Sequence, residues 1–113
     1  MSHCLFCRMI AGEIKAKVEY EDEDIYAVHD INPQAPVHLL IIPKKHIAQI
    51  KDLNELDSKL AGSLIFLAKQ LAVQEKIEDG YRLVFNNGSS AGQTVFHVHL
   101  HLLGGRKMTW PPG

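Results

Sequence analysis

Three histidines, His97, His99 and His101, alternate with apolar residues in the segment 97–103. An alternating pattern has the period of a β-strand, so we expect the three imidazoles on one face and the apolar side chains on the other. A neutral imidazole nitrogen is a good nucleophile with a pKa near neutral pH, which suits phosphoryl or nucleotidyl transfer. Histidines at this spacing can also chelate zinc. The pattern therefore predicts a nucleophilic site or a metal site on a strand, and the alternative is a solvent-facing strand that carries three histidines without a function.

A second group of metal-ligating residues lies near the start of the chain, at Cys4-x-x-Cys7. This spacing occurs in redox pairs, in halves of zinc sites and by coincidence. A redox pair normally follows a strand and opens a helix, but only three residues precede Cys4, which disfavours that interpretation. Zinc needs two more ligands, and His46 and His97 are the candidates. The pair therefore predicts either half of a Cys₂His₂ site or two ordinary thiols.

Four sequence blocks resemble one protein family, the histidine triad nucleotide-binding proteins of the Hint branch. The first is the segment 97–103, with the pattern His-x-His-x-His-x-x and apolar residues at x. The others are Asp30-Ile31-Asn32-Pro33-Gln34-Ala35-Pro36, Ile42-Pro43-Lys44-Lys45-His46 and Trp110-Pro111-Pro112-Gly113. The blocks occur in the family's order, and the resemblance covers nearly the whole chain. It implies a single histidine triad (HIT) domain over residues 1–113.

The resemblance also implies an activity, the hydrolysis of purine nucleoside 5′-phosphoramidates such as adenosine monophosphate (AMP) linked to an amine. His99 would attack the α-phosphorus and form a nucleotidyl-histidine, while the leaving amine takes a proton through the His101 side of the site. His97 completes this catalytic set and His38 supports it. Asp30 would accept hydrogen bonds from the ribose hydroxyls, which suits a carboxylate. The nucleotide-binding residues carried over from the family are Phe6, Asp30, Ile31, Asn86, Gly92, Gln93, Thr94, His99 and His101.

The loop that precedes the triad, residues 86–94, is rich in small residues, so its backbone N–H groups can approach a phosphate closely. Many family members have serine where Thr94 stands here. Threonine keeps the hydroxyl, and its added methyl is expected to alter the choice of leaving group. Histidines, this hydroxyl and loop N–H groups can stabilise the charge that develops on phosphorus, so we expect no metal in the catalytic step.

The resemblance extends to zinc. Relatives in the wider superfamily, namely bacterial members and the galactose-1-phosphate uridylyltransferases, hold zinc between such a cysteine pair and two such histidines, whereas the better-known eukaryotic Hint proteins lack the pair. It thus implies a structural zinc on Cys4, Cys7, His46 and His97, where four protein ligands leave no open position for water. Two other functions stay open: a zinc-dependent hydrolase that uses the triad as ligands, and a nucleotide-binding adaptor with incidental activity.

Composition restricts the partners and the compartment. The 113 residues have the length of one domain, and 46% hydrophobic content is enough for a core. The net charge is −1 and no basic block exceeds Lys44-Lys45, which disfavours long nucleic acid as a partner. Apolar runs such as Leu39 to Ile42 are too short to span a membrane. With two cysteines and no leader-like start, we expect a cytoplasmic protein.

The hydrophobic pattern predicts an α+β fold with one antiparallel sheet. We expect a short helix over residues 5–11 ended by Gly12, and strands near 18–21, 25–29, 37–43, 81–86 and 95–104. A long helix, capped by Asn54 or Asp52 and ended by Gly80, lies between the third and fourth strands. Its apolar stripe is broad enough to face both the sheet and a second subunit. By resemblance, two subunits form a homodimer and their sheets join.

Overall fold

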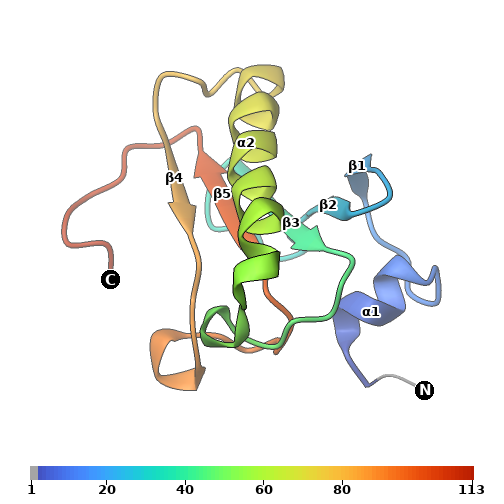
Figure 1. Ribbon diagram of the computed structural model, residues 1–113. Helices are drawn as coiled ribbons and strands as arrows, with labels where there is room; N and C mark the ends of the chain where they lie inside the picture. The colour runs from blue at the N-terminus through green and yellow to red at the C-terminus, as the bar shows by residue number, and fades with distance from the viewer. Residues whose placement is uncertain (1–2) are drawn as a thin grey trace.

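Five antiparallel strands form one sheet in the order β1-β2-β3-β5-β4, in a computed structural model that describes residues 3–113 (Figure 1). The strands are β1 Val18–Glu21, β2 Ile25–His29, β3 Val37–Pro43, β4 Tyr81–Val84 and β5 Leu100–Gly104. The helices are α1 Leu5–Ile10 and α2 Ser58–Gln74, with short 3₁₀ turns η1 Ile50–Asp52, η2 Glu55–Asp57 and η3 Ser89–Ala91. The predicted α+β class and its antiparallel sheet are confirmed.

The central strand β3 is buried on both faces, as its apolar run predicts. Leu39 and Ile41 point into the main core with β5 and the buried face of α2. Leu40 and Ile42 point the other way, into a smaller cluster that includes Phe6 of α1. Figure 1 shows α2 crossing one face of the sheet, while α1 lies away from α2, near the end of β3. The sheet face opposite α2 therefore carries the smaller cluster and α1.

The long helix begins later than the sequence pattern predicts. Asn54 caps the turn η2, where its side chain accepts the N–H of Leu56 at 2.9 Å and the Asp57 carboxylate accepts the N–H of Asn54 at 3.1 Å. This reciprocal capping box leads directly into Ser58, the first residue of α2. Asp52, the other predicted cap, lies inside η1.

The helix also ends earlier, at Gln74 and not at Gly80. Lys76 adopts a left-handed conformation with φ 62°, and the next N–H, of Ile77, bonds the Ala72 carbonyl at 2.9 Å. This is a Schellman ending with lysine where glycine is usual. The same motif ends α1 with Gly12 at φ 81°, as predicted. The glycine signal misplaced the end of α2 because Ile77, which packs against the core, fixes the motif instead.

The predicted strands at 81–86 and 95–104 are both too long. The β4–β5 ladder ends where Val84 pairs with His101, so β4 stops at Val84 and β5 begins at Leu100. Upstream of the ladder, the Val98 N–H bonds the Ile47 carbonyl at 2.7 Å. His97 and His99 therefore lie in an irregular segment, and only His101 of the triad belongs to a strand.

The apolar stripe of α2 divides into a buried part and an exposed part. Leu64, Leu67 and Leu71 are buried against the sheet, whereas Ile65 is 49% exposed and Val73 is 54% exposed. Among residues 3–113, neither helix combines the length and the apolar character that a membrane span needs.

Candidate active site and metal centre

A pocket of about 320 Å³ opens on the sheet face opposite α2. Its walls come from α1 and the turn after it, from the end of β2, and from the segment that leads into β5. The lining residues are Leu5, Phe6, Met9, Ile14, Lys15, Val28, His29, Asp30, Ile31, Leu40, Thr94, Val95, His99 and His101. Six of the predicted nucleotide-binding residues are among them. The three others, Asn86, Gly92 and Gln93, do not line it.

The hydrogen-bond partner of His99 Nδ1 shows which nitrogen of the neutral ring is unprotonated, and that nitrogen is Nε2. His99 Nδ1 lies 2.8 Å from the carbonyl oxygen of His97, which can only accept, so Nδ1 carries the proton. The Nε2 lone pair of the neutral ring is then available to attack. Burial lowers the pKa of His99 below its usual value, which keeps the ring neutral, and the ring of Phe6 meets it edge-on at 4.9 Å between centroids.

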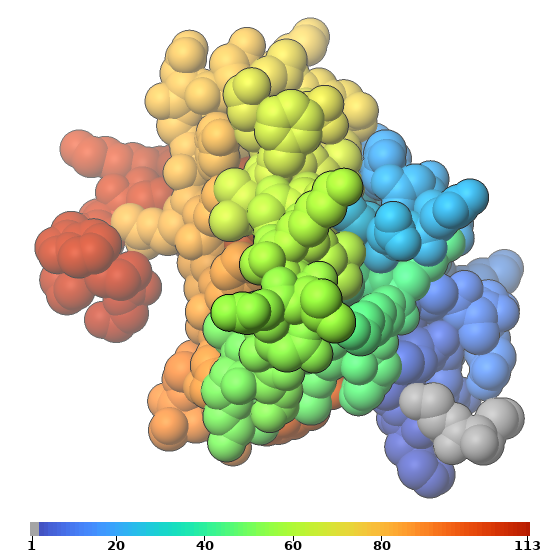
Figure 2. Space-filling view, viewed as in Figure 1, coloured from blue at the N-terminus to red at the C-terminus, as the bar shows by residue number. Residues whose placement is uncertain are grey.

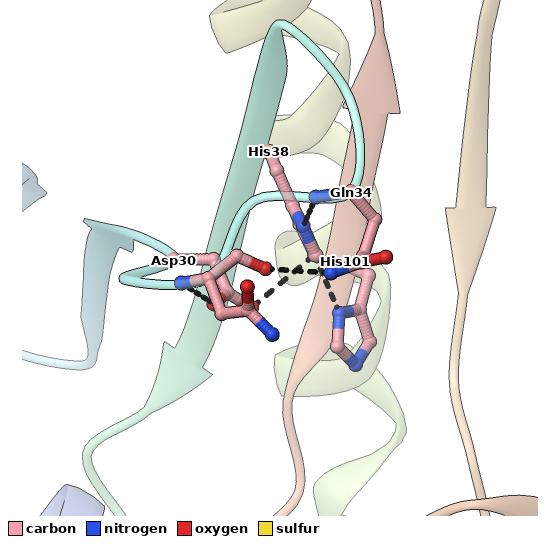
Figure 3. Close-up of polar contacts among 5 residues, drawn as sticks. Asp30, Gln34, His38 and His101 are labelled. Carbon is pink, nitrogen blue, oxygen red and sulfur yellow. Dashed lines mark hydrogen bonds and ion pairs between the residues drawn. The ribbon is translucent and has the colours of Figure 1, made fainter.

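His101 has the opposite arrangement, which a chain of hydrogen bonds fixes (Figure 3). The Gln34 N–H donates to His38 Nδ1 at 3.0 Å, so the neutral His38 ring carries its proton on Nε2. That Nε2–H donates to His101 Nδ1 at 2.9 Å, which leaves the His101 proton on its own Nε2. Burial, together with His99 and His38, lowers the pKa of His101 to about 4, so it stays neutral at pH 7. The role of Gln34 cannot be predicted from the sequence, because a backbone N–H leaves no signal in residue type.

The two carboxylate oxygens of Asp30 make different contacts at the end of β2. One carboxylate oxygen accepts the Asn32 N–H at 2.8 Å and closes the turn after β2. The other lies 3.4 Å from His38 Nε2, and the residue lines the pocket (Figure 3). A negative charge this near works against the burial that lowers the pKa of His38. Asp30 therefore lines the pocket and also contacts His38, the residue that is hydrogen-bonded to His101.

The loop 86–94 is organised by Gln93, whose side chain is 3% exposed. Its amide oxygen accepts the Gly88 N–H at 2.8 Å, and its amide nitrogen donates to the carbonyls of Ala48 and Val95 at 2.8 and 3.1 Å. In this structure the Gln93 side chain therefore holds the loop, and it is Thr94 that reaches the pocket.

Cys4, Cys7, His46 and His97 converge, with one ligand atom from each lying within 4.8 Å of the others. Nδ1 of His97 is 3.3 Å from Cys4 Sγ and 3.1 Å from His46 Nδ1, and Cys7 Sγ is 3.3 Å from His46 Nδ1. The other His97 nitrogen, Nε2, donates to the Pro43 carbonyl at 2.6 Å, so Nδ1 keeps a lone pair that faces the thiols. Zinc-ligating histidines characteristically make this backbone bond through their second nitrogen. The donor set fits a tetrahedral zinc ion.

A second candidate cluster, Asp30, His38 and His101, does not fit a metal equally well. His38 Nδ1 accepts the Gln34 N–H, so the ring proton of His38 is on Nε2, where it already bonds His101 Nδ1. A metal there would have to displace that proton and break the bond to Gln34.

The triad itself does not converge on one point. Among residues 3–113, the candidate metal groups separate His97 from His101 and leave out His99. The sequence pattern predicts all three rings on one face, but His97 precedes the strand and turns towards the cysteines. The geometry therefore counts against a hydrolase that uses the triad as zinc ligands.

Comparisons with known proteins place this arrangement in a family. The model for the HIT domain matches residues 11–108. A HIT family hydrolase from Legionella pneumophila has a crystal structure with a TM-score of 0.96 and 60% identity, covering 98% of this chain and 100% of that one. A 14 kDa zinc-binding protein of Zea mays is 49% identical over 114 residues, which are 99% of this chain and 89% of that protein. A histidine triad nucleotide-binding protein from Candida albicans has a TM-score of 0.82 and 33% identity, covering 96% of this chain and 82% of that one. This chain belongs to the family of histidine triad proteins defined by the HIT domain.

Proposed function

We propose that this chain is a hydrolase that cleaves purine nucleoside 5′-phosphoramidates through a covalent nucleotidyl-histidine at His99. One observation carries the proposal: two neighbouring imidazoles, 4.9 Å apart between centroids, present complementary Nε2 atoms. His99 offers a lone pair and His101 offers an N–H, as their partners require. A nucleophile beside a proton donor is the arrangement that covalent group transfer needs. The similar proteins named as a hydrolase and as a nucleotide-binding protein support this choice.

The pocket has an apolar part and a polar part, which suits a nucleotide. Leu5, Met9 and Ile14 give the α1 side an apolar lining for a purine. Asp30 provides the carboxylate for the ribose hydroxyls, and Thr94 lies with the histidines where the phosphate would be held.

The reaction then proceeds in two displacements. His99 Nε2 forms a bond to the α-phosphorus while the phosphorus–nitrogen bond of the substrate breaks, and the leaving amine takes up a proton from solvent that is relayed through the Nε2–H of His101. Water next attacks the phosphorus, the bond to His99 breaks, and the proton lost from water returns through His101. The nucleoside monophosphate is released and one water is consumed, so that two lower barriers replace one high barrier.

Zinc has a structural role in this proposal, held by Cys4, Cys7, His46 and His97. With four protein ligands, zinc would cross-link the N-terminal segment to the sheet. It would have no open position at which to activate a water molecule. Support comes from the lone pair that His97 directs at the thiols and from the similar protein named as zinc-binding.

A homodimer completes the proposal. β4 is an edge strand, and unpaired edges are usually covered in stable proteins. The outer side of α2 exposes Ile65 and Val73, and Trp110 is 84% exposed in a C-terminal segment that extends past β4 (Figure 2). A second subunit docked there would extend the sheet, and Trp110 would lie near its partner's pocket. Sedimentation near twice the 12.7 kDa chain mass would support this, and a concentration-independent monomer would exclude it.

The test of the function is a comparison of His99→Asn with wild type on adenosine 5′-phosphoramidate. Asparagine can keep a donor near the Nδ1 position but has no nucleophilic ring nitrogen. We expect turnover to fall to background while AMP still binds. Wild-type protein quenched in acid-free denaturant during turnover should carry a nucleotidyl adduct on the peptide that contains His99. Near wild-type turnover by the variant, or an adduct on another residue, would refute the assignment.

A further inference from the structure

The metal centre and the nucleotide pocket share two of their parts, and this inference rests on the function proposed above. The first shared part is α1, which lies between the two. Cys4 caps this helix and Cys7 lies within it, while Leu5, Phe6 and Met9 line the pocket. A six-residue helix is too short to be stable alone, so its position depends on its tertiary contacts. Phe6 is the one buried residue of α1, and its ring meets both His97 and His99.

The second shared part is His97. The His97 ring lies between the Pro43 carbonyl, which accepts its Nε2–H, and His46, which contacts its Nδ1. The His97 backbone carbonyl accepts the Nδ1–H of His99 at 2.8 Å. The same residue therefore connects the centre to the orientation of the proposed nucleophile. Because the side chain and the carbonyl belong to one residue in an irregular segment, a shift of the ring moves the group that holds His99.

The centre has a different network of contacts with and without a metal. Nδ1 of His97 has a lone pair, so the 3.1 Å contact with His46 Nδ1 requires either a proton on His46 or a cation between them. In the metal-free form the thiols contact the ring nitrogens of His46 and His97 at 3.3–3.5 Å, and such contacts to sulfur are weak. Coordination replaces these with four strong bonds that fix Cys4, Cys7 and His97 relative to one another.

We propose that metal binding at Cys4, Cys7, His46 and His97 is thermodynamically coupled to nucleotide binding in the adjacent pocket, with His97 as a positioning residue for His99. Filling the centre holds the α1 wall and the His97 carbonyl in the nucleotide-binding arrangement, so zinc tightens AMP binding. Coupling of this kind is reciprocal, and AMP must tighten zinc binding by the same factor.

The experiment measures both halves of the coupling on the full chain. Isothermal titration gives the Kd of AMP for zinc-loaded protein and for protein stripped by a chelator under reducing conditions, which prevent a disulfide between the thiols. We expect stripping to raise the Kd about 10-fold, within the usual range for coupled sites. Circular dichroism checks that the stripped protein is folded. In case it is not, the rate of zinc transfer from the loaded protein to a coloured chelator is measured with and without saturating AMP, and AMP should slow it.

Two further measurements separate positioning from general stability. Leu71→Ala lowers the stability of the α2 core far from the site, and it should leave the ratio of the two AMP affinities unchanged. The Nδ1–H proton of His99, assigned by its loss in His99→Asn, should be protected from exchange in the zinc-loaded protein and should exchange faster once zinc is removed.

The outcomes are distinct. Equal AMP affinities with and without zinc, together with an unchanged rate of zinc transfer, would overturn the coupling while leaving the proposed function intact. If AMP binds neither form, the proposed function fails and the coupling fails with it. If zinc-loaded Leu71→Ala loses as much AMP affinity as the wild type loses on stripping, the effect is one of stability and the positioning role of His97 is wrong.

Discussion

Replacing His38 by phenylalanine tests whether a hydrogen-bond chain sets the chemistry of His101. The phenyl ring is flat like the buried imidazole, though somewhat larger, and it lacks both nitrogens, so the Gln34 N–H loses its acceptor and His101 Nδ1 loses its donor. With no donor at Nδ1, the neutral His101 ring can move its proton to that nitrogen. The Nε2–H that faces the pocket in the native chain would then be lost for part of the time.

The size of the effect follows from the state of His101. With its pKa lowered to about 4 by burial and the neighbouring histidines, only about one ring in a thousand is charged at pH 7. The charged form, which has N–H groups on both nitrogens, is therefore too rare to substitute for the correct tautomer. A positioned proton donor contributes roughly 10²–10⁴-fold to rate, and we expect kcat to fall about 100-fold. The two unpaired groups should lower the free energy of unfolding by about 2–4 kcal/mol.

The assay compares kcat and KM on adenosine 5′-phosphoramidate for wild type, His38→Phe and His38→Gln, with Leu71→Ala as a control for lost stability. Glutamine can keep an N–H near the Nε2 position, so it should restore part of kcat. Nitrogen-15 spectra of the His101 ring report its tautomer directly. A His38→Phe variant with kcat within about twofold of wild type, or with the proton still fixed on His101 Nε2, would refute the reasoning.

Three other predictions concern acid stability, ribose binding and the end of α2. Because native His101 has its pKa lowered from 6.5 to about 4, the unfolded chain takes up the proton first, and stability should fall by about 2–3 kcal/mol between pH 6.5 and 4. Denaturant titrations at each pH should show a smaller fall in His101→Asn. Asp30→Ala should weaken AMP binding by about 1–3 kcal/mol and remove the preference for ribose over deoxyribose, measured by calorimetry; persistent discrimination would exclude Asp30 as the ribose ligand. Lys76→Gly should raise the free energy of unfolding by about 1 kcal/mol, because the residue has φ 62° and glycine adopts that conformation without strain; thermal melting that shows no gain would contradict this.

The elements that the sequence pattern predicts correctly are those defined by which side chains are buried and which are exposed to water. The run Leu39–Ile42 in β3 is apolar because both faces of the strand are covered, and the spacing of Leu64, Leu67 and Leu71 follows the buried side of α2. Element ends depend on single backbone hydrogen bonds instead. The bond from Val98 to Ile47 and the Schellman bonds at Lys76 determined where β5 begins and α2 ends, and neither is visible in hydrophobic pattern.

The same distinction explains which site residues could be found. The pair Cys4-x-x-Cys7 indicates a metal site by residue type and spacing, and the structure brings the two candidate partners, His46 and His97, to the thiols. The lining of the pocket by Leu5, Met9 and Ile14 was not predicted, because apolar residues of a short helix are the same whether they face a core or a ligand. Gln34 was not predicted either, since any residue but proline would supply its N–H.

The three triad histidines are identical in type and differ in the backbone or ring partner of one nitrogen each. The Pro43 carbonyl takes the His97 Nε2–H and leaves Nδ1 for a metal, whereas the His97 carbonyl takes the His99 Nδ1–H and leaves Nε2 for attack. His38 donates to His101 Nδ1, which makes the remaining nitrogen a donor. A repeating His-x-His-x-His pattern suggests three equivalent ligands, but a neutral imidazole has one donor and one acceptor, and a partner at either nitrogen decides the other. The proposed metal ligand, nucleophile and proton donor are therefore assigned by three hydrogen bonds, and only a structure that resolves those partners can distinguish them.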